Sequence, residues 1–116
     1  MKNLTKIEQK WQRIWDKTGI YNTKDRVKGK ENLYCLDMFP YPSGEGLHVG
    51  HLHGYVGSDV VSRYYRMRGF NVLHPIGFDA FGLPAENAAI KFGIHPKIWT
   101  QRNIKKITEQ LKNIGA

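Results

Sequence analysis

The stretch PSGEGLHVGHLHGY, residues 42–55, lies between an apolar run and a segment with helical periodicity. It contains four glycines and three histidines. Glycine in a turn between a strand and a helix permits backbone angles that other residues avoid and lets another group come close. Histidine is a poorer choice for a helix cap than Ser, Thr, Asn or Asp. The stretch therefore predicts an anion site where a strand gives way to a helix.

The segments on either side of this stretch predict a βαβ unit. Residues 32–39, NLYCLDMF, are apolar and rich in β-formers, and Pro40 ends the run, which favours a buried strand. Apolar residues then recur at intervals of three and four from Val49 to Met67, which predicts a helix with one apolar face. Residues 71–76, NVLHPI, predict a second short strand. Two strands joined in this way should be parallel, with a right-handed crossover.

Two further helices are predicted after the second strand. Pro84 suits the first turn of one helix and Gly93 its end. A last helix is expected from about residue 99 or 100, with Ile107 and Leu111 on its apolar face. The chain divides into residues 1–30, an amino-terminal helix with a basic loop, and residues 31–116, the α/β domain.

Basic residues are concentrated at the two ends of the chain. Residues 1–30 carry nine Lys and Arg against three Asp and Glu, and residues 91–116 carry six against one. A polyanion such as RNA suits such ends, although solvated helix faces give the same pattern. No apolar run reaches the length of a membrane span, which predicts no membrane partner. The single cysteine, Cys35, is expected to be a small buried group in a protein of the reducing cytoplasm.

Two loops should face one crevice, because ligands of open α/β sheets bind beyond the carboxyl ends of the strands. The first loop leads to His48 and His51, which share a helical face and can donate hydrogen bonds to phosphate oxygens. The second, residues 77–83, contains Asp79, a carboxylate suited to a substrate ammonium group. A turn aspartate is the alternative. A zinc site from these histidines and Cys35 is not expected, because no second cysteine exists.

The strings MFPYPSG, LHVGH and GFDAFGLPAENAA resemble the class I aminoacyl-tRNA synthetases, and among them the leucyl-tRNA synthetases. The resemblance runs from about Trp11 to the end of the chain. It implies the first βαβ half of a Rossmann-like nucleotide-binding fold. It also implies a cytoplasmic ligase that converts leucine and ATP to leucyl-adenylate and transfers the leucyl group to tRNA(Leu).

The resemblance also implies roles for individual residues. His48 and His51 would be catalytic, contacting the ATP phosphates, and Gly50 would pack against the adenosine. Asp79 would bind the α-ammonium of leucine. Mg²⁺ would lie on the ATP phosphates with no protein ligand. The residues bordering the leucine pocket would be Met38, Phe39 and Tyr41.

The length of the chain sets it apart from that family. Its 116 residues lack the Lys-Met-Ser-Lys-Ser-type loop and leave no room for an editing domain or anticodon-binding helices. The sequence therefore predicts an amino-terminal piece whose partner is the rest of a synthetase, marginally stable and prone to associate. A non-catalytic nucleotide- or tRNA-binding module is the alternative. A cytidylyltransferase-like enzyme fits less well, because such enzymes lack the MFPYPSG and DAFGLPAE segments.

Overall fold

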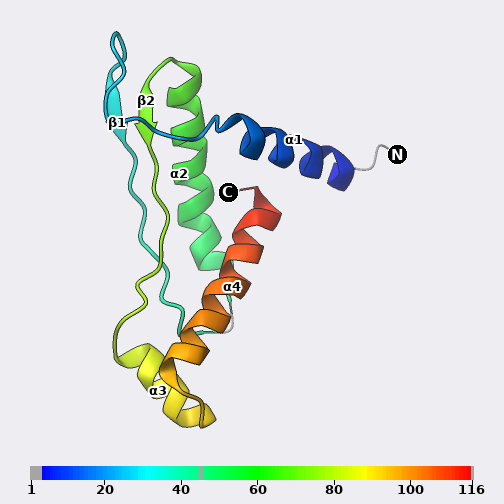
Figure 1. Ribbon diagram of the computed structural model, residues 1–116, viewed down its shortest axis with the longest axis vertical. Helices are drawn as coiled ribbons and strands as arrows, with labels where there is room; N and C mark the ends of the chain where they lie inside the picture. Colours follow the sequence, from blue (N-terminus) through cyan, green and yellow to red (C-terminus); the bar gives the residue numbers. More distant parts are fainter. Residues whose placement is uncertain (1–3, 45, 116) are drawn as a thin grey trace.

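The computed structural model describes residues 4–44 and 46–115, which form two parallel strands and the helices around them (Figure 1). The strands pair in the register Asn32 with Asn71, Leu33 with Val72 and Tyr34 with Leu73. A long helix joins them, so the predicted parallel pair is confirmed. No helix within these two ranges is both long and apolar enough to cross a membrane. The elements in chain order are α1 (Leu4–Thr18), β1 (Asn32–Tyr34), α2 (Val49–Met67), β2 (Asn71–Leu73), α3 (Leu83–Phe92) and α4 (Pro96–Ile114).

Both strands are shorter than the sequence predicts, and Pro75 explains why. The ladder runs from Asn71, whose N–H donates to Glu31, to Cys35, whose N–H donates to the Leu73 carbonyl. The next donor in this register would be residue 75, and proline has no N–H. The imidazole Nδ1 of His74 instead lies 2.9 Å from the Cys35 carbonyl oxygen. The hydrogen bonding between the strands therefore ends with a side chain instead of a backbone N–H. Cys35, which was expected to be buried, lies just past β1 and is only half-buried.

The predicted apolar face of α2 is present, but most of it is exposed. The apolar residues Val49, Val56, Val60 and Met67 are between 52% and 81% exposed. The buried residues of α2 are Tyr55 and Ser62, on the other side of the helix. Apolar periodicity identifies a face of a helix, but it does not say whether another element covers that face. An uncovered apolar side of this extent is typical of an interaction surface.

The core lies where α4 crosses α2. Tyr55, Ile107 and Leu111 form a buried cluster, against which Leu47 and Phe78 pack. The apolar face predicted for the last helix is thus confirmed at its two central positions.

The two helices after β2 differ from prediction in one respect. α3 begins at Leu83, has Pro84 in its first turn and ends at Gly93, whose φ is 63°, as predicted. α4 begins at Pro96, earlier than predicted, and His95 is its N-cap. The ring Nδ1 of His95 accepts the Lys97 N–H, and a proline is favourable in a first helical turn. Helix α4 therefore gains almost a full turn.

Candidate functional site

The first turn of α2 is capped by two histidine side chains, each of which accepts a backbone N–H. The Nδ1 atom of His48 accepts the Gly50 N–H at 3.1 Å, and the Nδ1 atom of His51 accepts the His48 N–H at 3.2 Å. Together they form a capping box, a role usually filled by Ser or Thr with Glu or Gln. The two rings lie close, with centroids 3.9 Å apart. The predicted pairing of His48 and His51 on one face is confirmed.

The capping bonds fix which ring nitrogen carries the proton. A nitrogen that accepts a backbone N–H must be unprotonated, so His48 and His51 are neutral rings with hydrogen on Nε2. Both Nε2–H groups remain available as donors. Burial and, secondarily, the electrostatic interaction with His48 lower the pKa of His51. The pair therefore offers neutral hydrogen-bond donors beside the positive end of a helix dipole, a suitable environment for phosphate.

Helix α4 holds the glycine-rich turn from the other side. Asn103, which is buried, donates its Nδ2 hydrogen to the Pro42 carbonyl at 2.9 Å. Further along α4, Gln110 Oε1 accepts the Leu47 N–H at 2.8 Å. The indole of Trp99 donates to the Ser43 carbonyl at 3.3 Å. Three side chains of one helix therefore fix the path of the turn that leads to His48.

Sequence reasoning missed these three anchors, although one of them left a signal. Asn103 lies four residues before Ile107 and eight before Leu111, so it shares their core-facing side of α4. A polar residue in the middle of an apolar stripe is expected to be hydrogen-bonded to something specific. The sequence could have identified Asn103 as a buried anchor, but not its partner.

The two loops that follow the strands lie side by side, as predicted. The Asp79 N–H donates to the Pro40 carbonyl at 3.1 Å. The Phe39 ring lies so close to Gly77 that a Cβ there would be 3.0 Å from it. Tyr41 and Asp79 line the same narrow cleft. The Asp79 side chain is exposed, and Met38 is 82% exposed.

Packing links these loops to the histidine pair. Phe78 packs against the cluster that contains Tyr55, and the Tyr55 ring centroid lies 5.9 Å from that of His51. Asp79 follows Phe78 directly in the chain. The imidazole pair and the Asp79 loop are therefore both attached to one buried cluster.

Asp37 is a further residue that the sequence analysis did not single out. Its carboxylate accepts the Ser58 hydroxyl on α2 and the Met38 N–H, both at 2.7 Å. The carboxylate also lies against Gly54, where a Cβ would be 3.3 Å from both of its oxygens. Asp37 thus fastens the segment that begins at Met38 to the helix that carries the histidines.

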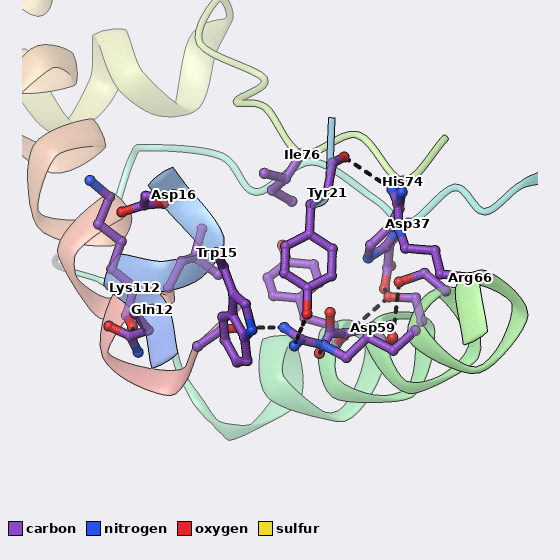
Figure 2. A pocket seen from close by; sticks show the side chains of 16 residues that line it. Gln12, Trp15, Asp16, Tyr21, Asp37, Asp59, Arg66, His74, Ile76 and Lys112 are labelled. Carbon is purple, nitrogen blue, oxygen red and sulfur yellow. Dashed lines mark hydrogen bonds and ion pairs between the residues drawn. The ribbon is translucent and has the colours of Figure 1, made fainter. Parts of the chain in front are cut away.

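A larger hollow, of about 310 Å³, lies elsewhere, between α1, the loop after it and α2 (Figure 2). Several of its polar groups are engaged with one another, although the buried Nε of Arg66 has no hydrogen-bond partner in the described part of the chain. Arg63 bonds to Asp59 at 2.7 Å and lies 4.8 Å from the ring centroids of both Trp15 and Tyr21. Its Nη2 donates to the Gly115 carbonyl. These bonds tie three segments together, and we place the candidate site at the histidines, whose capping bonds use only Nδ1.

No protein site for a metal is found in the described part of the chain. Within residues 4–44 and 46–115, no three His, Cys, Asp or Glu side chains gather in a way that could hold an ion. His74 is engaged with the Cys35 carbonyl, and the Cys35 thiol donates to the Ser58 carbonyl at 3.5 Å.

Comparison with known proteins agrees with this geometry. The family model described as tRNA synthetases class I (M) matches residues 33–116. The chain belongs to the class I tRNA synthetases. The matched range includes both the histidine-capped helix and the Asp79 loop.

Two curated relatives of this class I synthetase chain carry the same name. It is 57% identical over 115 residues to the leucine–tRNA ligase of Borrelia hermsii, covering 97% of the chain and 14% of that relative. It is 59% identical over 109 residues to the leucine–tRNA ligase of Chlorobium limicola, covering 94% of the chain and 13% of the relative. The chain therefore spans about one seventh of the length of the curated relatives it matches.

A solved structure gives the same result for the fold. The LeuRS of Agrobacterium radiobacter K84, crystallised in a ternary complex with tRNA and LeuAMS, superposes with a TM-score of 0.83 at 45% identity. The superposition covers 90% of the present chain and 13% of that chain. The class I synthetase chain thus shares the fold of this segment of a LeuRS.

Proposed function

We propose that this chain carries the ATP- and leucine-binding part of a leucine–tRNA ligase. Residues 31–116 would be the first half of a Rossmann-like catalytic domain, and residues 1–30 an amino-terminal helix and basic loop. The rest of a synthetase would be its partner, with tRNA(Leu) bound by the whole assembly in the cytoplasm. The observation that carries the proposal is the attachment of the His48–His51 pair and the Asp79 loop to one buried cluster.

In the proposed reaction, a carboxylate oxygen of leucine attacks the α-phosphorus of ATP. The bond from that phosphorus to the bridging oxygen breaks, and pyrophosphate leaves. Negative charge grows on the phosphate oxygens as this happens, and preorganised donors are most effective there. The Nε2–H groups of His48 and His51 would supply such donors, held at a fixed angle by their capping bonds. A ribose hydroxyl of the tRNA would then attack the leucyl carbonyl carbon, the bond from that carbon to the adenylate oxygen would break, and AMP would leave.

The remaining roles follow from position. Asp79 would pair with the α-ammonium of leucine, at the cleft that it shares with Tyr41. Met38 and Phe39 would border the leucine side chain, and Gly50 would lie beneath the adenosine. Mg²⁺ would be bound by the phosphates of ATP, where it neutralises their charge, and the described residues add no ligand set of their own.

The test is leucine-dependent ATP–pyrophosphate exchange, with isoleucine, valine and methionine in parallel. The expected result is exchange selective for leucine and lost in a chain with His48→Ala and His51→Ala together. A folded chain that binds ATP and supports no exchange would favour the non-catalytic nucleotide-binding module. This outcome is worth testing because this sequence contains no Lys-Met-Ser-Lys-Ser-type segment. Exchange that survives the double substitution would contradict the assigned roles.

A further inference from the structure

Gly50 lies under the imidazole of His48. A Cβ built at Gly50 would be 2.9 Å from Cε1 and 3.0 Å from Nδ1 of that ring. Contacts this short do not persist between real side chains, so a residue other than glycine would displace the ring. The same Nδ1 atom accepts the Gly50 N–H. The position of the His48 ring and its hydrogen bond therefore both depend on residue 50.

We propose that Gly50 is a positioning residue that acts through His48, by leaving room for the imidazole to cap the helix with Nε2–H facing outward. The inference rests on the proposed function for its consequence, phosphate binding, but not for its geometry. It differs from contact between Gly50 and the adenosine, because it predicts an effect on ligands that have no adenosine. It also explains why the glycine lies between the two histidines, because the N–H of residue 50 is the donor to Nδ1 of His48.

The fold should tolerate a methyl group at this position. Gly50 is exposed in the first turn of α2, and the atoms that would clash belong to the end of a side chain that can rotate into solvent. Alanine is also a better helix former than glycine. Gly50→Ala is therefore expected to fold normally and to lose the placement of His48. Gly57 gives a matched control, because it lies in the same helix and has no atom within 4 Å of a built Cβ.

The first arm of the test needs no ligand. Long-range ¹H–¹⁵N spectra of the histidine-labelled chain report which ring nitrogen of each imidazole is protonated. In the unsubstituted chain, Nδ1 of His48 and His51 should be unprotonated, whereas His74 should be protonated at Nδ1 because it faces a carbonyl oxygen. Gly50→Ala should move the His48 ring signals, and Gly57→Ala should leave them in place. Unchanged His48 signals in Gly50→Ala would overturn the inference.

The second arm compares ATP with inorganic tripolyphosphate. Hydrogen bonds to a charged group contribute about 1.5–3 kcal/mol, so His48→Ala should weaken both ligands about tenfold to a hundredfold. Gly50→Ala should weaken both by a similar factor, and the double variant should lose no more than His48→Ala alone. If Gly50→Ala weakens ATP and leaves tripolyphosphate unchanged, or if the two losses multiply, the inference is wrong.

The two arms separate this inference from the proposed function. A chain that binds neither ATP nor tripolyphosphate would count against the proposed function. The ring signals would still decide the role of Gly50, because they are measured on the free chain. Moved ring signals with unchanged tripolyphosphate affinity would refute a positioning role in phosphate binding.

Discussion

Replacing the buried amide of Asn103 should destabilise the chain and loosen the turn before His48. The Asn103 side chain is 3% exposed, and its amide donates to the carbonyl of Pro42, which is itself buried. Asn103→Ala removes a hydrogen bond worth about 1 kcal/mol and leaves that carbonyl without a donor, which costs about 1–3 kcal/mol. Water entering the vacated space would recover part of this. The expected loss in the free energy of unfolding is about 2–3 kcal/mol.

Urea denaturation followed by far-UV circular dichroism measures this loss. For urea slopes of about 1–3 kcal/mol per molar, the midpoint should fall by roughly 0.7–3 M. Lys105→Ala is the matched control, because Lys105 is exposed on the same helix and lysine and alanine have similar helix propensities. Its midpoint should stay within the change of about 0.5 kcal/mol typical of surface substitutions. Equal midpoints for Asn103→Ala and Lys105→Ala would refute the claim that α4 anchors the turn.

The other predictions concern exposure and protonation. Val60→Lys, on the exposed side of α2, should change the free energy of unfolding by less than about 0.5 kcal/mol and reduce self-association in sedimentation. Ile107→Ala should cost about 2–4 kcal/mol in urea denaturation, because Ile107 is 1% exposed, and a cost as small as that of Val60→Lys would be contradictory. Burial and then His48 lower the pKa of His51, so the folded chain should bind the proton less readily than the unfolded chain. The folded chain should therefore lose stability as the pH falls through 6.5 toward the lowered pKa. An NMR titration midpoint of His51 above 6.5 would disprove this. Burial and then two nearby aspartates raise the pKa of Cys35 above 9.0, so iodoacetamide should alkylate it more slowly in the folded chain than in urea, and equal rates would argue against it.

Features that arise from neighbouring residues could be predicted from the sequence. The parallel pair of strands, the helix between them and the two histidines on its first turn all follow from local pattern. The glycine-rich turn could be placed because a strand signal ends at Pro40 and a helix signal begins at Val49. The meeting of the two loops followed from a general rule on where parallel strands end.

Features that depend on partners far along the chain could not be predicted. The three bonds from α4 to the turn join residues that are 56, 61 and 63 positions apart. The apolar side of α2 was predictable as a face, but its exposure depends on what surrounds it. The length of β1 was set by Pro75, which lies just past the end of β2 and whose missing N–H ends the ladder.

The most direct test of the central claim is to map where a non-reactive analogue of leucyl-adenylate binds. The claim is that the histidine pair and the Asp79 loop form one site. ¹⁵N-labelled chain titrated with a sulfamoyl analogue should show its largest shifts at the rings of His48 and His51 and at the backbone amides of Met38 and Asp79. Shifts confined to the basic ends of the chain, with both rings unmoved at saturation, would contradict the account.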